Sequence, residues 1–182
     1  MSRNARTWWC VFCLLAGLIG FKADAAQAAQ TGDAPPAPVP AAIFTAKRIF
    51  ISNAGADSGL FPHPFSGTTE RGYNEFYSFM QGWGRYEIAA APSEADLVFQ
   101  LQLMAPNGPS NPSKQNGASD PLPTFRLAIY DAKTHFVLWV LTESIDPAYV
   151  QKTHDRNFDD ALGLLVGDLK LVVSRGAAAA VR

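Results

Sequence analysis

The sequence predicts an α/β domain of the α+β sandwich type, in which two helices pack on one mostly antiparallel sheet. Runs in which every second residue is apolar are typical of half-buried strands, and segments with apolar residues three and four positions apart are typical of amphipathic helices. These two patterns follow each other in the order β-α-β-β-β-β-α. The chain has 182 residues, which suits one such domain.

The first half of the domain is predicted to contain a strand, a helix and a second strand. Residues 47–52 place Ile49 and Ile51 on one face of a strand. Thr68 or Thr69 should cap the helix, and Gly82 and Gly84 should end it. The apolar face of this helix contains Tyr73, Phe76, Tyr77 and Met80. Residues 85–89 should form the short second strand.

The second half is predicted to contain three strands and a final helix. Residues 96–104 alternate between apolar and polar side chains, as expected for a strand with one buried face. Residues 124–130 and 136–145 should form an antiparallel hairpin. After a loop over residues 146–156, Asn157 is expected to cap the last helix. Its sheet-facing residues are Phe158, Leu162, Leu165, Leu169 and Val172.

The first 28 residues predict a secretory signal peptide. Two arginines precede an uncharged run from Trp8 to Phe21, which is shorter than the roughly 20 apolar residues that span a bilayer. Two A-x-A patterns follow, ending at Ala25 and Ala28, and match the cleavage signal. An uncleaved membrane anchor is the alternative. Without the signal, we expect no stable membrane span.

The remaining chain divides into a tether, a domain and a tail. Residues 29–45 are rich in alanine and proline and predict a flexible tether, although a proline-rich ligand for a partner is an alternative. The folded domain is expected over residues 46–176, and residues 177–182 should fray. Within the domain, residues 105–123 hold five prolines and predict a long mobile loop.

The charge and the cysteines exclude several classes of function. The chain has 15 basic and 16 acidic residues, and removal of residues 1–25 leaves a net charge of −3. This balance argues against a nucleic-acid partner and against tight binding to an anionic membrane. Cys10 and Cys13 both lie in the apolar run of the signal, and neither follows the small-residue pattern of a lipoprotein signal. The mature chain should therefore have no disulfide and no thiol catalysis.

Three motifs carry a resemblance to known proteins. They are W-G-R-Y-E-I at residues 83–88, S-E-A-D-L-V at 93–98, and F-R-L-A-I-Y-D-A-K-T at 125–134 followed by Val137-Leu138-Trp139. In this order they resemble a family of bacterial envelope proteins, mostly lipoproteins, that carry a domain of unknown function. The pattern is also similar to the amino-terminal domain of TolB-like proteins and to curli-secretion-type proteins. The resemblance covers roughly residues 46–175 and implies an α/β fold in the cell envelope.

Five residues are candidates for contact with a partner or ligand. In residues 60–67 two prolines alternate with Phe61, His63 and Phe65, and such a restricted loop could present aromatic side chains at a small entropy cost. Alternatively, both phenylalanines fold back and close the end of the sheet. His154 and Asp155 lie in the predicted loop before the last helix. With His63 or His135 they could form a metal or acid–base cluster, but such sites need three or four converging ligands.

No catalytic, cofactor-binding or metal-binding residue is predicted. The sequence lacks a nucleophile elbow, a phosphate-binding loop, a dinucleotide fingerprint and an H-E-x-x-H motif. Glu143 lies in an otherwise apolar strand, and the expected explanation is an ion pair with Arg126 on the neighbouring strand.

The predicted function is that of a secreted, periplasmic, non-enzymatic envelope domain. It should bind another envelope protein through the loops at residues 53–67 and 105–123, because loops on a rigid scaffold often carry binding residues. The alternatives are a small-molecule or glycan binder that uses loop 60–67, and an enzyme built around His63, His154 and Asp155.

Overall fold

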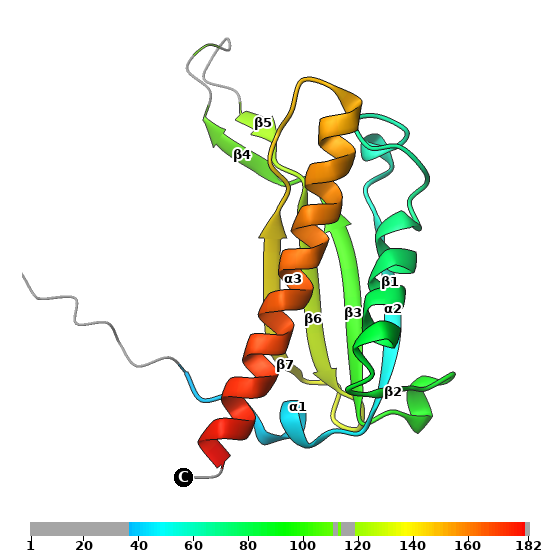
Figure 1. Cartoon of the computed structure of the whole chain (residues 1–182), viewed down its shortest axis with the longest axis vertical. Coiled ribbons are helices and arrows are strands. Elements are labelled where there is room, and N and C mark those ends of the chain that lie inside the picture. The colour runs from blue at the N-terminus through cyan, green and yellow to red at the C-terminus, as the bar shows by residue number, and fades with distance from the viewer. Residues whose placement is uncertain (1–36, 111–112, 114–118, 181–182) are drawn as a thin grey trace, which may run out of the picture. The chain divides into compact units, whose positions relative to one another are not determined.

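Residues 37–110, 113 and 119–180 are described by a computed structural model (Figure 1). A five-stranded sheet runs through this part in the order β2-β1-β3-β6-β7, and β4 and β5 form a separate two-stranded sheet. The helices α2 (Arg71–Trp83) and α3 (Gln151–Ala180) pack on one face of the larger sheet. The predicted α+β class is therefore confirmed.

The larger sheet is mixed, whereas a mostly antiparallel sheet was expected. β1 (Arg48–Ala56) is parallel to both β2 (Glu87–Ile88) and β3 (Leu97–Met104). β6 (Thr124–Asp131) is antiparallel to β3 and to β7 (Val137–Ser144). The parallel pairs arise because α2 carries the chain back to the end of the sheet at which β1 began.

The predicted hairpin of β6 and β7 is confirmed. Leu127 lies opposite Leu141 in its register. In the connecting turn, one carboxylate oxygen of Asp131 accepts backbone hydrogen bonds from Lys133 (2.9 Å) and Thr134 (2.7 Å). This Asx-type arrangement explains why the polar turn follows β6 directly.

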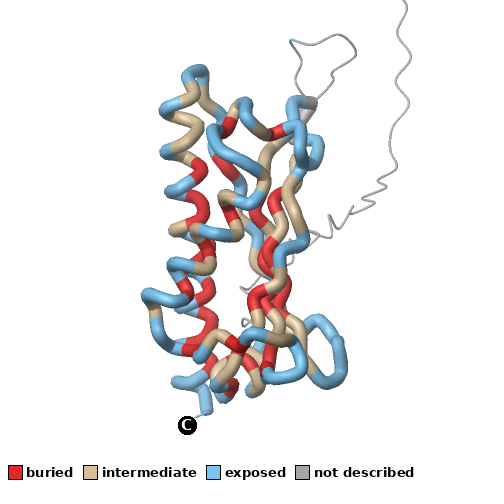
Figure 2. Tube along the Cα trace, turned by 90° about the vertical axis from the view of Figure 1, so that its right-hand side faces the viewer, coloured by how far each residue is buried: buried red, intermediate tan, exposed pale blue. Residues whose placement is uncertain are grey.

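The core lies between the sheet and the two long helices (Figure 2). In β3 the alternation predicted from sequence appears as alternating buried and half-buried side chains. On α2, Phe76 and Met80 are buried, and Gly84 ends the helix in the left-handed conformation at a φ of 64°. The largest fully buried side chains include Phe65, Phe76, Phe99, Phe125 and Phe158.

The expected cap of α2 is wrong. Glu70 occupies the N-cap position and makes no side-chain capping bond, and the backbone oxygen of Thr68 accepts a hydrogen bond from Arg71 N at 3.0 Å.

A short 3₁₀ helix, η2 (Pro92–Glu94), leads from β2 to β3.

The last five residues of the predicted tether belong to the fold. Ala41–Thr45 form helix α1, and its Ile43 is fully buried. Two side chains from the W-G-R-Y motif hold this short helix. The hydroxyl of Tyr86 donates to the carbonyl oxygen of Ile43 at 2.7 Å, and the guanidinium of Arg85 donates to the carbonyl of Phe44. The expectation of a flexible segment up to residue 45 failed because its proline-rich composition hid one apolar turn.

The long loop at residues 105–123 also contains regular structure. β4 (Asn107–Ser110) and β5 (Ser119–Pro121) pair antiparallel within it. Gly108 permits this approach, because a Cβ atom at this position would lie only 2.6 Å from the backbone oxygen of Asp120. The expectation of a loop without secondary structure was therefore wrong at both of its ends.

The last helix is longer than predicted at both ends. It begins at Gln151 rather than after a cap at Asn157, and the Asn157 side chain instead donates to the carbonyl oxygen of Asp146 at 3.0 Å. Residues 177–180, expected to fray, remain helical. The predicted sheet-facing stripe is correct, since its members are buried: Phe158, Leu162, Leu165, Leu169 and Val172.

The predicted signal peptide and residues 29–36 of the tether lie outside the described residues, as do Val181 and Arg182. In the part of the chain that the structure describes, no helix is both long and apolar enough to cross a membrane.

Candidate binding surface

The loop between β1 and α2 is held at several points along its length. Asp57 caps the short 3₁₀ helix η1 (Ser58–Leu60), and its carboxylate accepts a hydrogen bond from Gly59 N at 2.9 Å. The N–H of Asp57 itself donates to the carbonyl of Leu103 on β3 at 3.0 Å. Phe65 N donates to the carbonyl of Leu60 at 3.2 Å, which closes the loop on itself.

Aromatic side chains attach this loop to α3. The ring of Phe65 is 1% exposed and lies 5.2 Å from the ring of Phe158, centroid to centroid. Phe61 contacts Phe65 at 6.1 Å and Phe158 at 6.3 Å. The imidazole of His154 packs edge-on against Phe65 at 5.9 Å. Since aromatic pairs in these geometries are stabilising, the loop is anchored through its own phenylalanines.

A charged network fastens the end of the loop to both helices. The carboxylate of Asp155 accepts hydrogen bonds from the backbone N–H of Ser66 (2.9 Å), from its hydroxyl (2.5 Å) and from the guanidinium of Arg71 (2.7 Å). Arg71 also pairs with Glu75 (2.9 Å) and with Asp159, and it stacks 4.3 Å above the ring of Phe158. One arginine therefore joins the loop, α2 and α3.

The network controls the ionisation of its members. Burial opposes the charge on Asp155, but the hydrogen bonds from Ser66 and Arg71 outweigh it and hold the pKa of the carboxyl below its usual value. Burial likewise disfavours the charged guanidinium of Arg71, and the hydrogen bonds to Glu75 and Asp155 outweigh this and raise its pKa. Both groups are charged at neutral pH and are already paired with each other.

The exposed residues at this end of the molecule include His63, Tyr149 and Val150. Tyr149 is completely exposed (107%), and Val150 beside it is 59% exposed. His63 is exposed at the tip of the loop. The side-chain amide of Gln151 donates to the carbonyl of Pro62 at 3.1 Å, so the segment that carries Tyr149 and Val150 lies directly against the segment that carries His63. We call these three residues the tip surface.

Most of the predicted contact residues lie together in the structure, but their side chains contact other parts of the fold. Phe61, Phe65 and His154 form one aromatic cluster, and Asp155 is hydrogen-bonded one helical position further along α3. For Phe65 the expectation of a presented side chain was wrong, because its ring is buried in the core. The alternative, that the phenylalanines close the end of the sheet, describes it correctly.

No sequence motif pointed to Tyr149 or Val150. Both were placed in a connecting loop between the last strand and the last helix, and no role was assigned to them. The available signal was an aromatic and a branched apolar residue inside an otherwise polar segment, D-P-A-Y-V-Q-K at residues 146–152. Exposed large apolar side chains next to each other are informative in a way that single ones are not.

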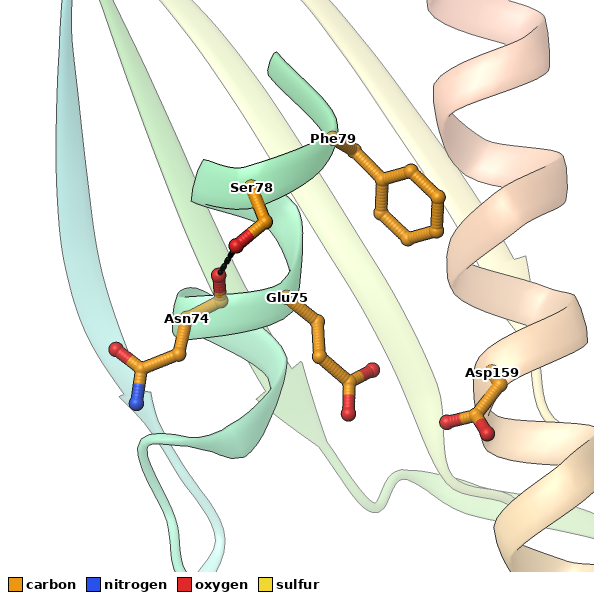
Figure 3. A pocket seen from close by; sticks show the side chains of 5 residues that line it. All are labelled: Asn74, Glu75, Ser78, Phe79 and Asp159. Carbon is orange, nitrogen blue, oxygen red and sulfur yellow. Dashed lines mark hydrogen bonds between the residues drawn. The ribbon is translucent and has the colours of Figure 1, made fainter. Parts of the chain in front are cut away.

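A hollow of about 520 Å³ lies between α2 and α3, lined by Asn74, Glu75, Ser78, Phe79 and Asp159 (Figure 3). The carboxylates of Glu75 and Asp159 point toward one another across it. Both carboxylates bind Arg71. Each carboxylate is therefore already in an ion pair with the same guanidinium, which explains why the two acids face one another.

The predicted ion pair between Glu143 and Arg126 is not formed. The register places Glu143 opposite Phe125 on the helix-covered face, whereas Arg126 lies opposite Thr142 on the other face. Burial first, and then the charges of Asp168 and Asp146, raise the pKa of Glu143. The sequence suggested the wrong partner because neighbouring positions on a strand point to opposite faces.

Among the described residues, no group of three or more histidine, cysteine, aspartate or glutamate side chains could hold a metal ion. The two histidines differ in their surroundings: His63 is exposed on the loop, and His154 is half-buried against Phe65.

Comparison with family models and with curated proteins finds no match. Similar solved structures include a Xanthomonas campestris protein of family DUF330, at 12% identity over 82% of this chain and 94% of that one, with a TM-score of 0.42. They also include uncharacterized lipoprotein B from Nitrosomonas europaea, at 13% identity over 81% and 94%, with a TM-score of 0.40. Lipoprotein GNA1162 from Neisseria meningitidis follows at 13% identity over 70% and 98%, with a TM-score of 0.35.

These neighbours are bacterial lipoproteins and proteins without an assigned function. At such identities and scores the likeness supports no inference about what this chain does, and it assigns the chain to no family. The resemblance to TolB-like and curli-secretion-type proteins stays an expectation from the sequence.

Proposed function

We propose that this chain is a non-enzymatic domain of the bacterial envelope, exported across the inner membrane, that binds another envelope protein through the tip surface. The observation that carries the proposal is the contrast between a fixed loop and its exposed end. Asp155, Arg71 and the buried phenylalanines hold the loop, while His63, Tyr149 and Val150 face solvent.

A fixed loop is a favourable place for a binding surface. Exposed segments that are already ordered lose little conformational entropy on binding, which increases affinity without any added contact. Tyrosine is enriched at the energetic centres of protein interfaces because it offers a large apolar area and a hydroxyl on a stiff side chain. Tyr149 and Val150 together supply the apolar part of such a surface, and His63 supplies a polar one.

The same end of the sheet carries the other predicted contact loop. β4 and β5 rise from the upper end of the sheet in Figure 1, next to the end of β3 at which the loop between β1 and α2 begins. A partner that covers the tip surface could therefore also reach residues 105–110 and 119–123. In this proposal the tip surface is the centre of the contact, and these residues enlarge it.

Binding of a glycan or small molecule by loop 60–67 is less well supported. Stacking on a sugar or a flat ligand needs an accessible aromatic face, and Phe65 is buried while Phe61 packs against Phe65 and Phe158. The hollow of about 520 Å³ is lined by residues of α2 and α3 and not by this loop.

Site-specific photo-crosslinking in the native bacterium tests the proposal. A photoreactive amino acid is placed at His63 or Tyr149, with Lys133 in the turn between β6 and β7 as the matched control, because Lys133 is exposed at the opposite end of the sheet. The proposal expects the same cross-linked protein from positions 63 and 149 and not from position 133. Equal labelling from all three positions, or none from 63 and 149, would contradict it.

A further inference from the structure

β7 forms an open edge of the sheet. The strand order ends at β7, and no other strand of the described residues pairs with its outer side. Ile145 N donates to the carbonyl of Pro123, toward β6, so strand alternation turns the N–H and C=O groups of Val140, Thr142 and Ser144 outward. The eight residues of β7 contain no lysine or proline, which commonly protect such edges.

A groove runs beside this edge, between β7 and α3. Its volume is about 720 Å³, and its lining includes Trp139 and Leu141 from the strand and Leu171 and Arg175 from the helix. Leu171 and Leu164 are 66% and 60% exposed and lie seven positions apart, on one side of the helix. The helix positions on this side follow a 4-3-4-3 spacing, which is the spacing of a helix–helix seam: Leu164, Asp168, Leu171, Arg175 and Ala178.

The two ends of this groove carry opposite charges. At one end, Glu143 faces Asp168, and no basic side chain of the described residues forms an ion pair with either carboxylate. At the other end, the guanidinium of Arg175 lies 5.8 Å from the ring centroid of Trp139. An acidic end and a basic end therefore flank an apolar centre at Leu141 and Leu171.

We propose that β7 pairs antiparallel with β7 of a second copy of this chain, about a two-fold axis that passes close to Leu141. A two-fold axis reverses the order of the groove, so the acidic end of one copy meets the basic end of the other. Val140 of one copy then lies opposite Thr142 of the second, and their outward N–H and C=O groups exchange hydrogen bonds. The two copies of α3 run antiparallel above the seam, with Asp168 against the second copy's Arg175.

A second copy fits this edge better than an unrelated extended peptide. Any peptide could add a strand to β7 through its backbone. Only an occupant with a cation near Glu143 and Asp168 and an anion near Arg175 can also form ion pairs with the charged side chains of the groove. This chain supplies both at the required spacing. The inference does not depend on the proposed binding function, because His63 and Tyr149 are not part of the seam.

Charge exchange between two variants tests the inference most directly. Asp168→Arg and Arg175→Asp each place like charges on both sides of the two-fold axis, so each should weaken self-association at least about tenfold. Mixed together, the two variants should restore it, because one copy then offers two arginines and the other two aspartates. Sedimentation velocity over a concentration series measures all three samples, and thermal melts show that each variant is folded.

A cysteine at the proposed axis provides an independent measurement. The antiparallel pair at Leu141 is of the non-hydrogen-bonded kind, with Cα atoms about 4.5 Å apart, which is within the range that a disulfide can bridge. The mature chain is predicted to contain no other cysteine. Leu141→Cys should therefore form a linked dimer under mild oxidation, whereas Ser78→Cys on the exposed side of α2 should not.

The outcomes separate clearly. A wild-type chain that stays monomeric at several hundred micromolar would overturn the inference. A dimer that persists unchanged in both charge variants, or that the mixture fails to restore, would show that another surface carries it.

Discussion

Replacement of Arg71 by alanine tests whether the charged network holds the loop below the tip surface. The guanidinium is bound to three carboxylates and to the carbonyl of Ser66, and the side chain is only 17% exposed. Removal leaves Glu75, Asp155 and Asp159 close together without a cation. We therefore expect the loop to loosen and the fold to lose stability.

The magnitude follows from the exposure of each partner. Asp155 is 24% exposed, and hydrogen bonds to such a charged group contribute about 1.5–3 kcal/mol. Glu75 and Asp159 are 35% and 55% exposed, and pairs of that kind contribute about 0.2–1 kcal/mol each. Together these give about 3 kcal/mol for Arg71→Ala. At a typical slope of about 2 kcal/mol per molar urea, the unfolding midpoint should fall by about 1.5 M.

Arg48 provides the matched control. It also pairs with two carboxylates, those of Glu87 (3.5 Å) and Glu94 (3.4 Å), but its side chain is 39% exposed and its partners more so. Its Nε atom is buried without a hydrogen-bond partner among the described residues. At about 0.2–1 kcal/mol for each of the two exposed pairs, Arg48→Ala should lower the free energy of unfolding by about 0.4–2 kcal/mol, less than Arg71→Ala.

The effect of Arg71→Ala should depend on pH in one direction. The pKa of Asp155 is lower in the folded state than in the unfolded chain. Its contribution to stability is therefore fully present above the unfolded carboxyl pKa near 4, and it is lost as the pH falls through the lower folded value. The difference between wild type and variant should shrink below pH 4. A loss as small as that of Arg48→Ala, or a difference that stays constant down to pH 2, would refute this account of the network.

Two further predictions concern the attachment of α1. Gly176→Ala should displace α1 and cost about 1–3 kcal/mol in urea unfolding, because a Cβ atom there would collide with the ring of Phe44; Gly167→Ala, with open space around it, should instead stabilise α3 by about 0.5–1 kcal/mol. Burial raises the pKa of Tyr86 to about 12, although the charge of Arg85 opposes this shift. The contribution of the Tyr86 phenol to the free energy of unfolding should therefore be fully present below pH 10 and should decline between pH 10 and 12. Tyr86→Phe should remove this decline, at a cost of about 1 kcal/mol at neutral pH from the lost bond to Ile43, and an unchanged alkaline decline would contradict the assignment.

The sequence predicted the elements whose side chains repeat over several turns or several strand positions. Alternation in β3 and the apolar stripes of α2 and α3 extend over eight or more residues, and these elements were expected near their observed positions. The two-residue strand β2 is an exception, since it lies within the short strand expected at residues 85–89. The missed elements are short. α1 has five residues and β5 has three, so neither shows a period. Long-range contacts with Tyr86, Arg85 and Gly176 stabilise α1, and local sequence does not contain them.

The candidate site was harder to predict for a related reason. Asp155 and His154 are polar residues beside a helix start, and such residues can either serve a partner or support the fold. Only the distances show that Ser66 and Arg71 already occupy the carboxylate of Asp155. For Tyr149 the sequence shows an aromatic residue in a polar segment, but only the folded chain shows that its side chain is exposed.

The two proposed surfaces have a joint consequence. A dimer built through β7 carries two tip surfaces, and two linked binding sites hold a multivalent or membrane-bound partner more tightly than either site alone. Asp168→Arg should then reduce the retention of such a partner while the photo-cross-link from Tyr149 remains, because the individual tip is unchanged. A loss of both signals would instead show that the tip needs the dimer to form, and retention unaffected by Asp168→Arg would show that each copy binds on its own.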